Sequence, residues 1–252
     1  MSGLRLTFVF GNFEKMAEFV IDKWRDISSE AIGSRGFFSV ALSGGKTPVK
    51  IYRRLAGEVG KGLLRRKTHI FFVDERFVPA TDKDSNYRMI RETLLDGAGV
   101  PMRNIHSLNT NLPDPASAAE RYERDIASFF KLSGHNIPEF DLIMLGIGVD
   151  GHTASLFPGS PALEEKKRLA SAVIFSGKKH SRITLTLPVL NKAKHVIFLV
   201  TGKRKAEVLR AVIQESDPSL PASLVAPDNG NLLYLADSNA GSLLREKEKK
   251  RV

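Results

Sequence analysis

An aspartate and a histidine stand two residues apart in the stretch LGIGVDGHTASLFPG, residues 145–159, just after an apolar run. An imidazole is partly neutral near neutral pH and can take a proton from water, which makes His152 a candidate general base. Asp150 is close enough in sequence to orient the ring or to favour its charged form during a reaction. We therefore predict that His152 activates water and that Asp150 supports it.

Other roles for this stretch fit the residue pattern less well. Gly146, Gly148 and Gly151 have the spacing of a dinucleotide-binding fingerprint, but Pro158 and Pro161 interrupt the helix that must follow it. A metal site is also disfavoured, because the chain has no cysteine and its histidines lack ligand spacing. The sequence thus predicts neither a dinucleotide site nor a metal site here.

A second stretch, SGGKTPVKIY from Ser43 onward, has the residues of an anion-binding turn. Gly44 and Gly45 allow a ligand to approach the backbone closely. Thr47 and Pro48 are suited to the cap and the first turn of a helix. Free amides at a helix start, together with the helix dipole, bind phosphate or carboxylate, so this turn predicts an anion site.

Two enzyme motifs are rejected in these stretches. The nucleotide-binding P-loop requires a glycine where the chain has Val40. Ser43 and Ser155 are candidate nucleophiles, but neither lies in the Gly-x-Ser-x-Gly turn of an α/β-hydrolase. Attack by water is therefore favoured over attack by a serine.

Four apolar runs end directly in polar or glycine-rich sequence: FFSVAL before SGGKTP, HIFFV before DER, FDLIML before GIGVDGH, and HVIFLV before TGKRKA. The carboxyl ends of parallel strands share one edge of a sheet, and ligands bind in the crevice there. Asp74 and Arg76 of DER are therefore expected to face His152. Lys205 of TGKRKA and Arg182, which opens the run RITLTL, are expected to bring positive charge to a bound phosphate.

Periodicity predicts the elements that position these residues. Apolar residues recur with a helical period in residues 13–32, 49–59, 86–95, 116–132 and 203–215. Short runs rich in β-branched and aromatic residues predict strands: LRLTFVF, FFSVAL, HIFFV, FDLIML, SAVIF, RITLTL, HVIFLV and NLLYLA. The alternation predicts an α/β fold with one domain over residues 1–243, loops at 97–101, 111–115 and 217–231, and a basic, disordered tail over residues 244–252.

Composition narrows the class of protein. The chain has 252 residues, no cysteine and a formal net charge of +10. With no cysteine and no leader or membrane-spanning stretch at its start, it is expected in the cytoplasm and not at a membrane. The basic residues are dispersed apart from five in the tail, so nucleic-acid binding is not predicted. The sequence leaves the oligomeric state open, and a monomer is compatible with it.

Six stretches, in this order, resemble the 6-phosphogluconolactonase family: ALSGGKTP, VDERFVPATDKDSNYRMIRETLL, FDLIMLGIGVDGHTASLFPG, RITLTLPVL, VTGKRKAEVL and LPASLV. The resemblance runs from about Leu42 to Leu235 and implies a Rossmann-like three-layer αβα sandwich with a mostly parallel central sheet. It also implies hydrolysis of a small sugar-phosphate lactone, 6-phospho-D-glucono-1,5-lactone, to 6-phospho-D-gluconate in the oxidative pentose phosphate pathway, without a cofactor.

The resemblance also implies a role for each matching residue. His152 would be the base and Asp150 its support, while Asp74 and Arg76 would line the pocket near the sugar. Six residues would surround the phosphate: Ser43, Gly44, Gly45, Thr47, Arg182 and Lys205. The donor to the oxygen that becomes negative in the tetrahedral intermediate stays open between Arg76 and a backbone amide of residues 146–151.

Two other functions remain as alternatives. Amino-sugar-phosphate deaminases and isomerases of the same superfamily share these motifs, but they carry a glutamate shortly after the histidine, in a context resembling NEP. Ser155, Leu156 and Phe157 occupy that region here, which favours the lactonase. The second alternative is a sugar-phosphate-binding protein without turnover, and the intact Asp-Gly-His argues against it. The chain departs from the family before Arg182, where SGKKHS replaces an approach resembling KPPPE.

Overall fold

The largest element of the fold is an eight-stranded sheet with the strand order β11, β1, β10, β9, β6, β2, β3, β5. The computed structural model describes residues 3–59, 66–175 and 180–252. All neighbouring strands of this sheet pair in parallel. The predicted α/β fold with a mostly parallel central sheet is therefore confirmed.

Most strands of the central sheet coincide with the predicted apolar runs. They are β1 Arg5–Phe10, β2 Phe38–Leu42, β3 Thr68–Phe72, β5 Ile105–His106, β6 Leu142–Leu145, β9 His195–Val200, β10 Asn231–Asp237 and β11 Lys250–Arg251. Only β5 and β11 were not predicted, because two residues are too few to form an apolar pattern. Every residue of β2 and of β6 is buried, as a sheet covered on both faces requires.

All five predicted helices are present, with shifted ends. The helices are α1 Phe13–Arg35, α2 Lys46–Val59, α4 Asn86–Ile90, α5 Asp96–Ala98, α6 Pro115–Phe130, α7 Leu187–Lys192 and α8 Ala206–Arg210. π-helical residues Arg91–Leu95 join α4 to α5, and α8 is preceded by the 3₁₀ turn Lys203–Lys205 and continued by the π-helical Ala211–Glu215. The short α5 lies where a loop was expected over 97–101, and the six-residue α7 was not predicted.

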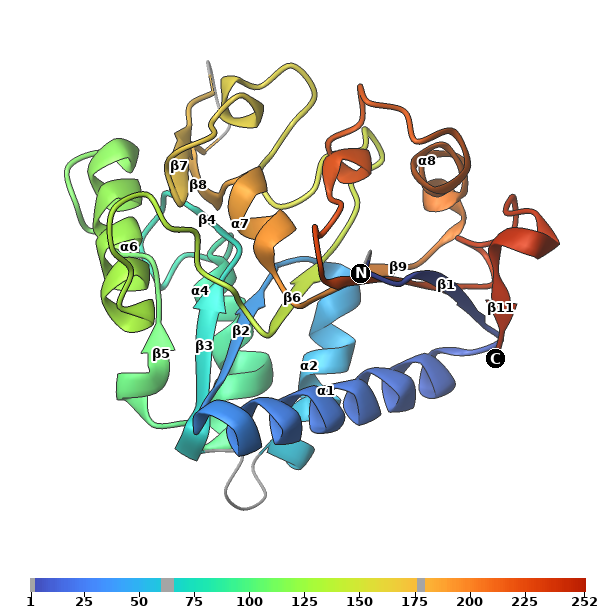
Figure 1. The fold of residues 1–252 in the computed structure, drawn as a ribbon, viewed down its shortest axis with the longest axis horizontal. Coiled ribbons are helices and arrows are strands. Elements are labelled where there is room, and N and C mark those ends of the chain that lie inside the picture. Colours follow the sequence, from blue (N-terminus) through green and yellow to red (C-terminus); the bar gives the residue numbers. More distant parts are fainter. Residues whose placement is uncertain (1–2, 60–65, 176–179) are drawn as a thin grey trace.

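Helices cover both faces of the central sheet, so the described chain forms three layers. In the view of Figure 1, α1 and α2 lie below the sheet and α7 and α8 above it. The helix α1 buries one stripe that includes Met16, Val20 and Trp24, and the Trp24 ring packs edge-on against Phe38 of β2, with ring centroids 5.2 Å apart. Gly36, with φ of 84°, ends this helix in the left-handed conformation.

A second, three-stranded sheet is antiparallel and consists of β4 Asp74–Arg76, β8 Arg182–Leu185 and β7 Ala170–Val173. The DER segment, expected as a polar exit from β3, is thus itself a strand, whose charged residues hide any apolar pattern. Its pairing sets Arg76 opposite Arg182. Buried apolar residues of both sheets belong to one contiguous cluster, which supports the proposal of a single domain.

The strand order reverses between β2 and β6, and the predicted site lies at this reversal. From β2 the chain proceeds to its neighbour β3, whereas from β6 the sheet continues through β9 to the other edge. Crevices outside the carboxyl ends of strands at such a reversal are the usual ligand sites of open α/β sheets. The segments that follow β2, β3, β6 and β9 therefore meet at one edge.

The C-terminal residues differ from the expected disordered tail. Leu244 is buried, and β11 pairs with β1 at the edge of the sheet. The amide of Val252 donates to the oxygen of Val9, and the amide of Gly11 donates to the oxygen of Val252. The basic composition of the tail gave no sign of this pairing, because backbone groups make it.

Candidate active site

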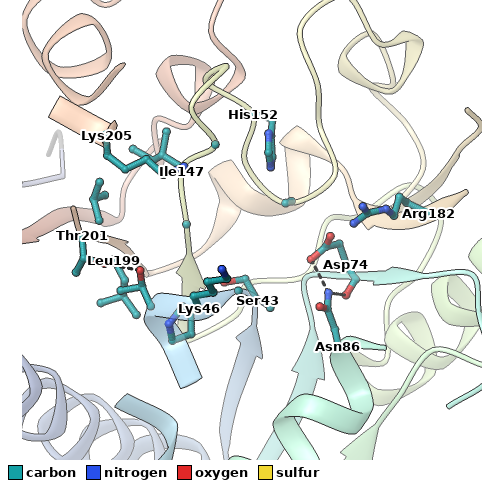
Figure 2. Close-up of a pocket in the computed structure, with 18 of the residues that line it drawn as sticks. Ser43, Lys46, Asp74, Asn86, Ile147, His152, Arg182, Leu199, Thr201 and Lys205 are labelled. Atoms are coloured by element: carbon teal, nitrogen blue, oxygen red, sulfur yellow. Dashed lines mark hydrogen bonds between the residues drawn. The ribbon is translucent and has the colours of Figure 1, made fainter. Parts of the chain in front are cut away.

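A cavity of about 580 Å³ opens at the carboxyl edge of the central sheet. Of the ten residues proposed for the site, nine line it: Ser43, Gly44, Gly45, Thr47, Asp74, Arg76, His152, Arg182 and Lys205. Asp150 does not line the cavity but is hydrogen-bonded to His152 Nδ1. The glycine turn after β2 and the histidine after β6 therefore share one cleft, as the strand exits predicted (Figure 2).

Asp150 and His152 form a hydrogen-bonded pair, with 2.5 Å between Asp150 Oδ1 and His152 Nδ1. The Asp150 side chain is about half exposed and the His152 side chain a third exposed. Burial by itself raises the pKa of Asp150, but the charge of His152 and the hydrogen bonds from its ring and its amide outweigh this and lower the pKa below its usual value. With Nδ1 bonded to a carboxylate, Nε2 is the nitrogen left to act as a base.

The loop between β6 and His152 is a tight turn that requires glycine. The amide of Gly148 donates to the oxygen of His152 over 2.7 Å, and the amide of Gly151, a residue with φ of 81°, donates to the oxygen of Gly148. A Cβ atom at Gly148 would lie 2.1 Å from His152 Nδ1 and 2.3 Å from Asp150 Oδ1. Only glycine at this position leaves room for the Asp150–His152 pair.

The segment after His152 is fixed to the second sheet. Ala154 has φ of 52°, which is a strained conformation for a residue other than glycine. Ser155 donates its hydroxyl to Asp74 Oδ2 over 2.6 Å and its amide to Thr184 Oγ1. Because Ser155 is fully buried and already bonded, it is not placed to act as the nucleophile.

The glycine turn after β2 differs in detail from its prediction. The helix α2 begins at Lys46, three residues before the predicted start, and Thr47 is inside it rather than capping it. The Thr47 hydroxyl instead forms a 2.6 Å hydrogen bond with the hydroxyl of Thr201, which follows β9. Gly45 has φ of 117°, and a Cβ atom at Gly44 would lie 1.9 Å from Asn86 Oδ1.

Three buried polar atoms around the cavity have no hydrogen-bond partner within the described chain: Ser43 Oγ, Arg76 Nε and Arg182 Nε. Buried polar groups are normally paired, so unpaired ones that line a cavity indicate where a polar ligand binds. The Tyr52 hydroxyl donates to the Ser43 oxygen over 2.9 Å and holds the turn in place. Arg76 is held through Nη1, which donates to the Asp84 oxygen over 2.7 Å.

Arg182 and Lys205 approach the cavity from two sides, with His152 between them in the view of Figure 2. Burial lowers the pKa of Arg182 below its usual value, and the nearby positive charge of Arg76 lowers it further. Burial likewise lowers the pKa of Lys205, although the Asp150 carboxylate opposes this. An anion in the cavity would stabilise the charged form of both groups.

Sequence reasoning missed several residues that line the cavity, including Lys46, Asn86, Ile147, Phe157 and Thr201. Asn86 donates to both the backbone oxygen and Oδ1 of Asp74 from the first residue of α4, and no spacing rule links the two positions. Thr201 directly follows the apolar run of β9, so the rule of strand exits could have found it.

Three further expectations concern metal sites, membrane-spanning helices and the loop before Arg182. Within the described ranges, no group of three or more His, Cys, Asp or Glu side chains could hold a metal ion. None of the helices in those ranges has the length and apolar character needed to cross a bilayer. In the SGKKHS segment, residues 176–179 lie outside the described residues.

The fold and the cleft together define an open parallel α/β protein in which a glycine turn and a histidine hydrogen-bonded to a carboxylate share one cavity. A family model described as glucosamine-6-phosphate isomerases/6-phosphogluconolactonase matches residues 12–234. The chain therefore belongs to this family.

Several relatives that the chain resembles are 6-phosphogluconolactonases. It is 42% identical over 219 residues to the 6-phosphogluconolactonase of Synechocystis sp., which covers 86% of this chain and 89% of the relative. It is 40% identical to the human 6-phosphogluconolactonase, covering 84% and 83% of the two chains. The solved 6-phosphogluconolactonase of Trypanosoma cruzi is 32% identical, with a TM-score of 0.84 over 97% of this chain and 98% of that one.

Proposed function

We propose that the protein hydrolyses 6-phospho-D-glucono-1,5-lactone to 6-phospho-D-gluconate, a step of the oxidative pentose phosphate pathway. The observation that carries this proposal is that one cavity holds the Asp150–His152 pair together with the unpaired polar atoms of Ser43, Arg76 and Arg182. The names of the relatives support the same substrate. We also propose that the protein acts in the cytoplasm, as a chain without cysteine favours.

His152 is the general base of the proposed reaction. Its Nε2 takes a proton from a water molecule as that water attacks the lactone carbonyl, and the carboxylate of Asp150 stabilises the imidazolium that forms. The imidazolium then returns the proton to the ring oxygen as the carbon–oxygen bond of the lactone breaks. The Asp150–His152 hydrogen bond at 2.5 Å supports this division of roles.

Arg76 is the proposed donor to the negative oxygen of the tetrahedral intermediate. The alternative was a backbone amide of residues 146–151, and two of these amides, those of Gly148 and Gly151, already donate within their own turn. Arg76 Nε is buried without a partner in the described chain, and Arg76 lines the same cavity as His152. A fixed donor of this kind contributes about 3 to 4 kcal/mol to transition-state stabilisation.

The phosphate is the remote anchor of the substrate. We propose that Ser43, the Gly44–Gly45 turn and Thr47 bind it together with the charges of Arg182 and Lys205, while Asp74 faces the sugar. The unpaired Ser43 hydroxyl and the positive φ of Gly45, which glycine adopts without strain, support this placement. Binding energy from the phosphate then holds the carbonyl beside His152, which converts affinity into orientation.

The deciding experiment compares the wild-type protein with His152→Ala on freshly prepared lactone in the presence of a chelator. We expect metal-independent hydrolysis by the wild type and a loss of about 10²- to 10⁴-fold in kcat for the variant. His135→Ala, which removes an exposed histidine outside the cavity, is the matched control and should retain full activity.

Calorimetry with 6-phosphogluconate completes this experiment. The His152→Ala variant should still bind the product, because the groups proposed for the phosphate are intact. Equal turnover by His152→Ala and wild type would remove the proposed base. Product binding by a wild-type protein that does not hydrolyse the lactone would instead identify a binding protein without turnover.

A further inference from the structure

Among the residues that the structure describes, the His152 ring makes one hydrogen bond, and that bond is exposed. Asp150 fixes the position of Nδ1, but its side chain is about half exposed, so water competes for the carboxylate. A single hydrogen bond also leaves the ring free to tilt about the line that joins its two atoms. The direction of Nε2, which must meet the attacking water, therefore depends on other contacts.

Two further contacts surround the ring. The backbone of Gly148 lies so close that a Cβ atom there would meet Nδ1 at 2.1 Å and Cε1 at 2.3 Å. The Phe157 ring packs on the imidazole with ring centroids 4.5 Å apart and the planes inclined by 36°. Of these two contacts, only the one with Phe157 is made by a side chain, so it can be removed without forcing an atom into the Asp150–His152 pair.

Phe157 is itself held in place. It follows Leu156, which is fully buried and exchanges two backbone hydrogen bonds with Thr153, at 3.3 Å and 2.9 Å. Its ring packs edge-on against Phe175, with centroids 5.2 Å apart and an interplanar angle of 82°. Aromatic pairs at this separation and angle favour one relative orientation, so Phe157 presents a fixed surface to the imidazole.

We propose that Phe157 is a positioning residue for the reaction: its ring fixes the plane of the His152 imidazole, so that Nε2 faces the cavity. This rests on the proposed role of His152 as the base. Phe157 also lines the cavity, so a direct contact with the sugar is the competing explanation for any effect of its removal. The two explanations predict different kinetic constants, because misorientation of a base lowers kcat whereas a lost binding contact raises KM.

The experiment compares Phe157→Leu, which keeps apolar volume but removes the ring, with Phe157→Tyr, which keeps the ring. We expect Phe157→Leu to lower kcat about 10- to 100-fold with KM nearly unchanged, because small misplacements of a reacting group cost this much. Phe157→Tyr should restore most of kcat. Phe129→Leu, which makes the same change in the aromatic cluster of α6, should leave both constants unchanged.

Nuclear magnetic resonance gives a readout that does not depend on turnover. In protein with isotope-labelled histidine, the carbon-bound protons of His152 lie in the ring current of Phe157, and their signals should move in Phe157→Leu and return in Phe157→Tyr. Thermal melting checks that each variant is folded. Unmoved His152 signals, or a raised KM with wild-type kcat, would overturn the positioning role.

The failure of the proposed function is distinguishable from the failure of this inference. If His152→Ala is as active as the wild type, the proposed base is wrong whatever Phe157 does. The histidine signals of Phe157→Leu then still show whether this ring packs on the imidazole in solution.

Discussion

Asp150 is the residue on which the proposed chemistry of His152 depends most directly. Its pKa is lowered, so the carboxylate is ionised throughout the neutral range. The stability that its interaction with His152 contributes is therefore present above the usual value of 3.8 and is lost as the pH falls through the lower value of the folded state. The Asp150 carboxylate is therefore available to accept a hydrogen bond from His152 Nδ1 across the neutral range.

Replacement of this charge tests the pair. We expect Asp150→Asn to lower kcat roughly 10- to 100-fold, the equivalent of one charge-assisted hydrogen bond, with KM nearly unchanged. Steady-state kinetics at neutral pH measure this. Asp228→Asn, a change of the same kind in an exposed loop, is the control and should have no effect. A KM effect without a kcat effect would instead place Asp150 in substrate binding.

Arg182 and Lys205 are predicted to act on binding rather than on chemistry. Arg182→Ala and Lys205→Ala should each raise KM about 10- to 100-fold, the loss of a charged hydrogen bond, while lowering kcat less. Because the two cations reach the cavity from two sides, the two increases measure their contributions separately. An unchanged KM in both variants would displace the phosphate site.

The pH dependence of product binding follows from Lys205. Its ammonium binds phosphate only while protonated, and burial lowers its pKa from the usual 10.5. Affinity for 6-phosphogluconate should therefore weaken as the pH rises through this lowered value, at a lower pH than an ordinary lysine would allow. Calorimetry at increasing pH measures the effect. Lys205→Arg, which keeps its charge, should make the affinity for 6-phosphogluconate less dependent on pH. An equally steep dependence in this variant would exclude Lys205 as the group that causes it.

At the scale of elements, Glu75 connects β4 to α4. Its buried carboxylate accepts hydrogen bonds at 2.7 Å from the amides of Arg76, Asn86 and Tyr87, and one at 3.1 Å from the Ser85 hydroxyl. Burial raises its pKa, and the three amides partly oppose this. The carboxylate thus sets the start of the helix whose first side chain, Asn86, is bonded to Asp74.

We expect Glu75→Gln to lower the free energy of unfolding by about 1 to 3 kcal/mol, because its amide group cannot accept from all of these donors and leaves a buried N–H unpaired. Chemical denaturation measures this. Glu92→Gln, which alters an exposed pair with Arg88 on the following helical turn, should leave the unfolding midpoint nearly unchanged. Equal stability of the two variants would show that the Glu75 hydrogen bonds contribute little.

The elements predicted best from sequence are those whose pattern follows from burial. Strands such as β2 and β6 are covered on both faces and read as unbroken apolar runs, and α1 has a clear apolar stripe. The segments that were missed are fixed by partners distant in the chain. The strand β4 exists because it pairs with β8, and β11 because it pairs with β1, and neither pairing leaves a local signal.

The residues of the candidate site also fall into two groups, those with a local sequence pattern and those without one. The glycine turns and the Asp-Gly-His segment have short-range signatures because their backbone geometry demands glycine at Gly45 and Gly151. Asn86 acts through a hydrogen bond to Asp74, and Phe157 through ring contacts with His152 and Phe175, and spacing alone encodes neither.

At the scale of the whole molecule, β11 covers the edge of the central sheet that β1 would otherwise expose. Deletion of residues 246–252 should lower the melting temperature and allow association through the uncovered edge, while kcat stays unchanged because this edge is far from the cavity. Light scattering across a concentration series measures the association. The double variant Lys250→Gln with Arg251→Gln keeps the backbone pairing, so its melting temperature and its association should match those of the full chain. Association in both variants would attribute the effect to charge.

The chain has no cysteine, and the cleft lies at the carboxyl edge of the central sheet, so a single introduced thiol could carry a label away from the cleft. Ser34 is exposed in the last turn of α1, close to the amino end of β2, a strand whose carboxyl end leads to the cleft roughly 16 Å from its start. Ser34→Cys would introduce the sole thiol of the chain. A maleimide dye or a solid support attached there would leave the entrance of the cleft unobstructed.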